Sequence, residues 1–268
     1  MKKQKVAEKR AKKKRGMLEI FAESFKKLFE QPVIIVPFLF TMLAAALGAA
    51  IFFVIFFLAI LAAEKTAASL VIAIGIIVGV IVAGALVFVS AFFYAGAFGM
   101  AKEILNKKKV SLKTMINYGK KFWLRLVGVY VLVSVIFLVL FALLFGVFIA
   151  GTMANASDMT DPASLFQKSS LLMFFLFFIC MLLAALFMLL FLLSPFYLVL
   201  ENLPVIKAIK RGFSVSLHNY LGLFGISVMF FLLNFVIGFV PFVGGLISMF
   251  IISPAATLAW MLFAIDRR

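Results

Sequence analysis

The sequence predicts an all-α protein that crosses a membrane six times. Of its 268 residues, 66% are apolar and only 13% are charged, and the mean hydropathy is +1.23. A soluble domain is about half apolar and about a quarter charged. The apolar residues also gather in uncharged runs that are much longer than the segments of a soluble core. We therefore expect lipid to surround most of this chain.

The uncharged runs define the spans. Four of them exceed the roughly 20 residues that a helix needs to cross a bilayer, and a fifth is long enough for two crossings. The fifth contains the turn-forming cluster Pro241-Phe242-Val243-Gly244-Gly245, which we expect to divide it. No segment shows the alternation of a membrane β-strand. The predicted helices lie at about residues 33–61, 69–99, 123–152, 171–199, 221–240 and 246–265.

The distribution of Lys and Arg predicts the orientation. If the N-terminus is cytoplasmic, 24 of the 26 basic residues lie on the cytoplasmic side, and only Lys65 and Lys168 lie outside. Short cytoplasmic loops of membrane proteins are enriched in Lys and Arg. We therefore predict a multi-pass protein of the cell membrane with both termini in the cytoplasm.

Residues 1–16 form a basic tail. They contain nine basic residues and one Glu, and too few apolar groups to fold alone, so we expect disorder. The first apolar run begins too late and is too long for a signal peptide. The predicted domains are this tail and a six-span membrane domain over residues 17–268. Because basic tails suit the phosphates of RNA, a ribosome or another protein partner at this tail is one hypothesis.

Segments ahead of the three odd-numbered spans show helical amphipathic patterns. In the first, one face carries the apolar residues and the opposite face carries Glu19, Glu23, Lys26 and Lys27. The apolar face consists of Leu18, Phe21, Ala22, Phe25, Leu28 and Phe29. The pattern recurs 94 residues later, and less regularly after another 94. We predict three interfacial amphipathic helices on the cytoplasmic side and a threefold internal repeat. The repeat units are residues 17–101, 110–200 and 204–265. Alternatively, basic amphipathic segments ahead of spans look alike without a repeat.

Basic residues on these segments are the candidate contacts for lipid. A basic interfacial helix places its cations among anionic headgroups, so we expect anionic lipid, or an acidic partner, to bind there. The alternative is that the positive charges only set the topology. The candidate contacts are Lys26, Lys27, Lys113, Lys120, Lys121, Arg125, Lys207, Lys210 and Arg211.

The sequence offers no pattern typical of an enzyme, a metal site or a cofactor site. Cys180 and His218 are each the only residue of their kind. There is no phosphate-binding loop and no HExxH motif. Charged residues stay at the span edges, which argues against proton pumps and voltage sensors. We expect no enzymatic activity, cofactor or metal.

A few residues inside or beside the spans are unusual for lipid-facing helices. Asn234 is the one amide deep in a span, so it either bonds to a neighbouring helix or lines a polar cavity. Pro195 and Pro254 should kink the fourth and sixth helices, which more often shapes packing than gates a pathway. Gly75 to Gly79 is a GxxxG pattern that we expect to serve packing within the chain. Asn155 begins a glycosylation sequon on the outer side.

A local motif carries a family resemblance. Ser194-Pro195-Phe196-Tyr197 is followed by the run from Glu201 to Phe213, which reads ENLPVIKAIKRGF. A span, an acidic residue, a basic amphipathic helix and another span resemble prokaryotic six-span families of unassigned function. They also resemble the membrane domain attached to some glycerophosphodiester phosphodiesterases. The resemblance implies a membrane module and supplies no catalytic residues, because the chain has no hydrolase domain.

The sequence therefore favours a non-enzymatic membrane scaffold or lipid-interacting module with a basic cytoplasmic face. The alternative is the membrane subunit of a transporter or channel. A polar central cavity would favour transport, and its candidate lining residues are Tyr94, Ser134, Ser194, Asn234 and Thr257.

The orientation can be tested with reporters. A reporter that is active only outside the cytoplasm should be active beside Lys65 or Asp158 and inactive beside Lys108, because 24 basic residues hold the opposite side in the cytoplasm. Enzyme activity in whole cells measures this. Cytosolic reporters at Lys65 or Asp158 would refute the predicted topology.

Overall fold

The computed structural model describes residues 15–63, 68–156, 175, 178–179, 181–241 and 243–268. These residues form helices and turns and contain no strand. Several features named from the sequence lie outside the described residues: the tail up to Lys14, Lys65, Lys168, Cys180 and Ser157 of the sequon.

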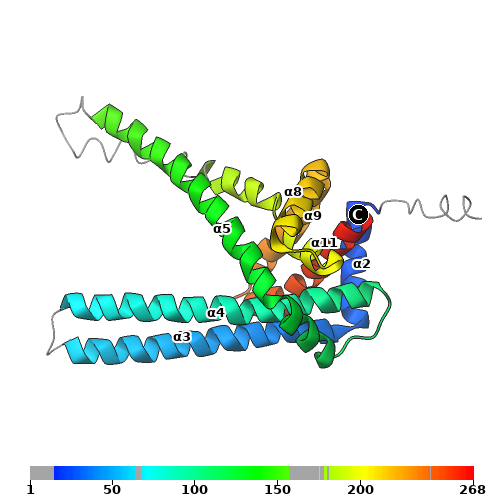
Figure 1. Cartoon of the computed structure of the whole chain (residues 1–268), viewed down its shortest axis with the longest axis horizontal. Coiled ribbons are helices and arrows are strands. Elements are labelled where there is room, and N and C mark those ends of the chain that lie inside the picture. Colours follow the sequence, from blue (N-terminus) through cyan, green and yellow to red (C-terminus); the bar gives the residue numbers. More distant parts are fainter. Residues whose placement is uncertain (1–14, 64–67, 157–174, 176–177, 180, 242) are drawn as a thin grey trace, which may run out of the picture.

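The described helices follow the predicted order (Figure 1). Six of them are long and apolar enough to cross a membrane, which confirms the all-α polytopic fold class. Residues 181–189 are also helical. The other elements are α2 (Met17–Glu30), η1 (Pro32–Ile35), α3 (Val36–Ala63), α4 (Ala68–Leu105), α5 (Leu112–Ala156), α7 (Ser194–Glu201), α8 (Val205–His218), α9 (Tyr220–Gly238), α10 (Val243–Ile247), η2 (Ser248–Ile252, a π-helix) and α11 (Ser253–Asp266).

The second and third spans are longer than predicted. α3 and α4 lie side by side as a long hairpin, and α5 crosses α4 and then diverges from it (Figure 1). α5 begins at Leu112 and continues without a break for 45 residues, about 68 Å at 1.5 Å per residue. The middle amphipathic segment is therefore the first part of a span, whereas α2 and α8 are separate helices. The physical reason is that this segment contains no proline before the apolar run begins, whereas Pro32 follows α2.

The fourth and sixth spans are interrupted next to the two prolines that predict kinks. A turn at Leu190–Leu193 precedes Pro195 in the first turn of α7. The π-helix η2 precedes Pro254 in the first turn of α11. Proline has no N–H to donate and its ring clashes with the preceding turn, so a regular helix cannot run through it. The predicted division near Pro241 is also present, since α9 ends at Gly238 and α10 begins at Val243.

α11 lies at the centre of the bundle. Every residue from Pro254 to Met261 except Trp260 is buried, and so are Leu262, Phe263 and Ala264. Helices α2, α4, α7 and α9 all contact it. By contrast, large apolar side chains on the outer faces of α3, α4, α5 and α9 are exposed, as lipid-facing residues must be.

Polar contacts gather the two described chain ends and the loops between spans at one end of the bundle, which we call the basic end. Arg15 near the start of α2 pairs with Asp266 at the end of α11, at 3.7 Å. Arg268 pairs with Glu201 at the end of α7, at 3.1 Å. The ammonium group of Lys102 on α4 donates to the last carbonyls of α7, at 2.9 and 3.1 Å. Both described ends therefore lie on the same side of the six spans.

Glycines on α4 allow α5 to approach closely. A Cβ added at Gly96 would lie 2.6 Å from Cγ of Met115, and one added at Gly99 would overlap the ring of Tyr118. The GxxxG pattern at Gly75 and Gly79 faces phenylalanines of α3, so it serves packing within the chain, as predicted. Small residues matter here because, in lipid, packing rather than water exclusion holds helices together.

The substitution Gly99→Ala should destabilise the protein by about 1–3 kcal/mol, because the new methyl group forces the Tyr118 ring away from α4. Thermal unfolding in detergent, followed by circular dichroism, measures this. Gly84→Ala is the matched control, since nothing lies within 4 Å of a Cβ added at Gly84. Equal melting temperatures for the two variants would contradict the close α4–α5 contact.

Candidate functional site

The first candidate site is the surface of the basic end, and α2 forms part of it. Ile20, Ser24 and Leu28 are buried, mainly against α11. Leu18 and Phe29 are exposed, although the sequence placed them on the same apolar face as Leu28. The predicted apolar face is therefore divided between protein contact and an exposed strip. Acidic and basic residues occupy the face opposite the buried stripe.

α8 has the same division. Ala208, Gly212, Val215 and Ser216 are buried. Gly212 is needed because a Cβ at this position would lie 2.5 Å from the backbone nitrogen of Ser194. The exposed residues include the apolar Ile206 and Leu217 and the basic Lys207, Lys210 and Arg211, and Ser214 and His218 are exposed as well.

The first four turns of α5 repeat this division. Met115, Gly119 and Phe122 are buried against α4, with Leu126 following in the same stripe. Leu112, Ile116 and Leu124 are exposed apolar residues. The exposed basic residues of this segment are Lys113, Lys120, Lys121 and Arg125.

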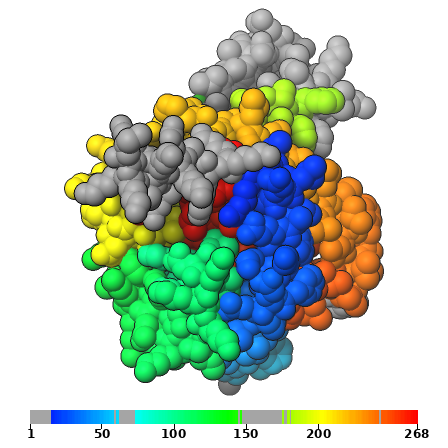
Figure 2. Space-filling view, turned by 90° about the vertical axis from the view of Figure 1, so that its right-hand side faces the viewer, coloured from blue at the N-terminus to red at the C-terminus, as the bar shows by residue number. Residues whose placement is uncertain are grey.

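The three segments share a rotational order. At 3.6 residues per turn, α2 and α8 each present a protein-facing stripe, then exposed apolar residues, then charged residues, in the same sense around the axis. The start of α5 follows this order through Leu112 and Ile116, whereas Leu124 lies among its basic residues. Leu28, Phe122 and Ser216, spaced 94 residues apart, are all buried. Figure 2 views the molecule from this end, where the blue α2, the green start of α5 and the yellow α8 surround the red C-terminal part of α11. The threefold repeat itself stays a prediction, which this order supports.

The nine basic candidates differ in their contacts. Lys27 pairs with Glu30 at 2.6 Å, and this hydrogen bond holds the pKa of the Glu30 carboxyl below its usual value. Arg125 donates to the side-chain oxygen of Asn202 at 3.2 Å. Lys121 and Arg211 lie over the rings of Phe122 and Tyr197, at 5.1 and 5.7 Å from the ring centres. The exposed candidates are Lys26, Lys113, Lys120, Lys121, Arg125, Lys207, Lys210 and Arg211.

Asn202 explains why α7 gives way to α8 at this end. It ends α7 in the left-handed conformation, with φ of 53°, which asparagine tolerates better than most residues. Pro204 then precedes α8 in an extended conformation. The sequence ENLP therefore ends one helix, turns the chain and starts the basic helix along the end of the bundle.

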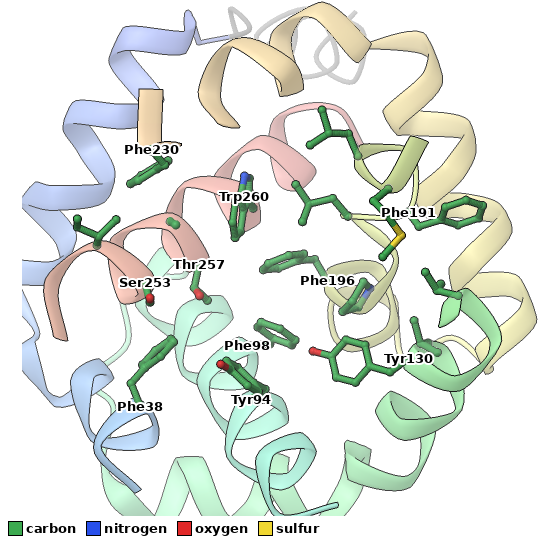
Figure 3. Close-up of a pocket in the computed structure, with 18 of the residues that line it drawn as sticks. Phe38, Tyr94, Phe98, Tyr130, Phe191, Phe196, Phe230, Ser253, Thr257 and Trp260 are labelled. Atoms are coloured by element: carbon green, nitrogen blue, oxygen red, sulfur yellow. The ribbon is translucent and has the colours of Figure 1, made fainter. Parts of the chain in front are cut away.

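The second candidate site is a central cavity of about 460 Å³, shown in Figure 3. All six spans contribute to its lining. Six aromatic rings form a chain along the wall, with neighbouring ring centres 4.6–6.3 Å apart: Phe38, Tyr94, Phe98, Phe196, Trp260 and Phe230. The two interrupted spans border the cavity, since Pro195, Ile252 and Ser253 line it.

Asn234 lines this cavity and also bonds to its neighbours. Its amide nitrogen donates to the carbonyl of Phe230, and its side-chain oxygen accepts a hydrogen bond from Ser248 in the π-helix. Ser253 donates to the carbonyl of Ser248 at 3.1 Å. One side chain therefore joins α9 to the sixth span, as the first interpretation expects, and also faces the central cavity.

Three hydroxyl groups face the cavity without a hydrogen-bond partner in the described part of the chain. They belong to Tyr94, Tyr130 and Thr257, and Thr257 is only 4% exposed. Figure 3 shows all three turned into the same open space. The indole N–H of Trp260 is also buried without a partner among the described residues.

The structure brings together three of the five candidate lining residues expected from the sequence. Tyr94, Asn234 and Thr257 line the central cavity. Ser134 lines a separate groove between α4 and α5, and Ser194 is buried beneath Gly212. The lining is mainly apolar and aromatic, so the cavity differs from the polar one that would favour transport. Tyr130 was missed because a tyrosine between apolar residues has no local signal that shows which way it points.

A family model described as a domain of unknown function, DUF7847, matches residues 17–266. The chain belongs to the DUF7847 family. No curated protein and no solved structure matches it. The membership confirms an uncharacterised family, as the resemblance implied. The likeness of this DUF7847 chain to the membrane domain of glycerophosphodiester phosphodiesterases stays a sequence-based resemblance.

The DUF7847 match covers both candidate sites. It begins at the start of α2 and ends at the end of α11, so it includes α2, the start of α5, α8 and all described residues that line the cavity. Within the described residues, no group of three or more His, Cys, Asp or Glu side chains could hold a metal ion.

The bond between Asn234 and Ser248 can be tested by a double-mutant cycle. Asn234→Val and Ser248→Ala should show a coupling of about 1 kcal/mol, because each single change already removes the shared hydrogen bond between α9 and η2. Unfolding in mixed micelles measures this. Ser227→Ala, which removes a buried hydroxyl without a partner, is the control and should be additive with Asn234→Val. Strict additivity in both cycles would contradict the bond.

Proposed function

We propose that this DUF7847 protein is a non-enzymatic membrane protein whose basic end lies in the cytoplasmic leaflet of the cell membrane and binds anionic lipid headgroups. The observation that carries the proposal is the shared division of α2, the start of α5 and α8 into a protein-facing stripe, exposed apolar residues and charged residues. A helix with these three faces fits the boundary where protein, acyl chains and headgroups meet.

The exposed apolar residues set the depth of these helices. Leu18 and Phe29 on α2, and Ile206 and Leu217 on α8, lie beside charged residues and are 53–73% exposed within the described part of the chain. Burying them in the acyl boundary removes apolar surface from water. The neighbouring Lys and Arg groups then reach the headgroups, as amphipathic side chains do at membrane surfaces.

The charge of the basic end supplies the preference for anionic lipid. Each Lys or Arg near an anionic surface contributes about 1 kcal/mol, and salt weakens the attraction. α8 carries three exposed basic residues within five positions, and its last residue is His218. Lys27 should contribute less than Lys26, because Glu30 already neutralises it. We therefore expect α8 and the start of α5 to dominate.

A transporter is the alternative function, and the central cavity is the observation that favours it. All six spans line it, as a substrate path through the bundle would require. Its described lining contains no charged side chain, so an ion would not be stabilised there. Any transported substrate would therefore be uncharged and largely apolar.

Spin-labelled lipids test the lipid preference of the full-length protein. In reconstituted bilayers, labelled phosphatidylglycerol should associate several-fold more strongly than labelled phosphatidylcholine, and high salt should remove the difference. The triple variant Lys207→Gln, Lys210→Gln, Arg211→Gln should lower this preference by at least about threefold, because it removes charges worth about 1 kcal/mol each. Electron paramagnetic resonance measures the bound fraction.

The matched control is Lys107→Gln, Lys108→Gln, Lys109→Gln, which removes the same charge from the exposed loop between α4 and α5. It should lower the preference less, because these residues do not lie on an interfacial helix. Equal association of the two labelled lipids would overturn the proposed function. Equal effects of the two triple variants would show that total charge, and not the helices, attracts the lipid.

A further inference from the structure

The central cavity has chemistry that lipid binding at the basic end does not use. We propose that it binds one lipid with an uncharged head that carries carbonyl oxygens and is joined to a hydrocarbon tail. A diacylglycerol and an isoprenoid quinone are lipids of this kind. This site is distinct from the basic end, so the inference goes beyond the proposed function and can fail independently of it.

The described lining excludes a charged head. None of the described residues around the cavity is Lys, Arg, His, Asp or Glu. A phosphate or ammonium group placed there would lose its hydration without a counter-charge, which is costly in an apolar environment. The volume of about 460 Å³ lies within the range of small-molecule sites, about 300–1,000 Å³. An uncharged head fits both facts.

The free hydroxyl groups indicate that the lipid head carries hydrogen-bond acceptors. Tyr94, Tyr130 and Thr257 have no hydrogen-bond partner in the described chain and share one open space (Figure 3). Asn234 and Ser253, in contrast, already bond to Ser248. Buried polar groups are normally hydrogen-bonded, and a hydroxyl can donate to a carbonyl oxygen. A ligand with one or two carbonyl oxygens would satisfy these donors.

The aromatic wall suits the apolar part of such a ligand. The chain of rings from Phe38 to Phe230 presents flat faces and edges to the cavity. Aromatic rings bind other flat groups and hydrocarbon through offset and edge contacts. The wall therefore accepts the ring of a quinone as readily as the start of an acyl chain.

A groove between α4 and α5 provides a route from the bilayer. It holds about 630 Å³, and Tyr94 and Tyr130 line both the groove and the central cavity. Val131, Val135 and Leu138 line it as well and are largely exposed, so the groove faces lipid. It lies where α5 diverges from α4 (Figure 1). The geometry allows the head to lie beyond the two tyrosines while the tail remains in the groove.

Tryptophan fluorescence can measure binding, because the chain has only two tryptophans and Trp260 lines the cavity. The full-length Trp123→Phe protein therefore reports on Trp260 alone. In bilayers of phosphatidylcholine, a diacylglycerol with brominated chains or decylubiquinone should quench Trp260 saturably. Phosphatidylglycerol with the same brominated chains should quench it only weakly. Comparing the first two probes decides between a diacylglycerol and a quinone.

The variant Tyr94→Phe, Tyr130→Phe, Thr257→Val removes the three hydroxyls and nearly keeps the shape. It should raise the half-saturating probe concentration at least about 10-fold, since a hydrogen bond contributes about 1 kcal/mol. Tyr220→Phe is the matched control, because that hydroxyl bonds to the carbonyl of Leu186 and does not line the cavity. If the triple variant misfolds by circular dichroism, Thr257→Val alone should still raise the concentration several-fold.

Two results would overturn the inference. One is equal quenching by all brominated lipids whatever their heads, which shows contact with bulk lipid only. The other is saturable quenching that the hydroxyl variants leave unchanged. The α8 charge variant separates the two proposals, because it should reduce the preference for phosphatidylglycerol and leave the quenching of Trp260 by the uncharged probes intact.

Discussion

Close packing around α11 is the interaction on which the rest of the structure depends. In a bilayer there is no water to drive helices together, so small side chains that let neighbours approach must do it. α11 supplies Ala255, Ala256, Ala259 and Ala264, all buried, and four helices contact it. The hydroxyl of Tyr197 on α7 donates a hydrogen bond to the carbonyl of Ala264 at 2.9 Å, which stabilises the contact between α7 and α11. Both candidate sites are built around this helix, since its C-terminal end lies at the basic end and its first turns line the cavity.

The cavity follows from the two interrupted spans. A continuous helix satisfies its own backbone groups, and a break leaves some of them to other partners. The break before Pro254 is a π-helix, a form that often occurs at functional sites. Here it places the hydroxyl of Ser248 against Asn234, which joins the sixth span to α9. The same irregularity carries Ser253 and Thr257 to the cavity wall.

Aromatic packing connects the two candidate sites. Phe21 and Phe25 on α2 lie against Phe230, with ring centres 5.0 and 6.1 Å apart, and Phe230 lies 6.3 Å from Trp260 in the cavity wall. A displacement of α2 would therefore move side chains that line the cavity. This contact gives the basic end and the bundle centre a direct physical connection.

The sequence by itself determined the fold class, the number of spans and the side on which the positive charges gather, because apolar length and charge placement are local properties. It also located the interruptions at Pro195 and Pro254. Tertiary structure alone decided that part of the apolar face of α2 packs on α11 while Leu18 and Phe29 stay exposed. It also decided that the middle amphipathic segment and the third span form one continuous helix, α5. It alone brought Tyr94, Tyr130 and Thr257 together, because each lies on a different span and its direction depends on how the helices are rotated against one another. Periodicity shows which residues share a face, but only packing shows what that face meets.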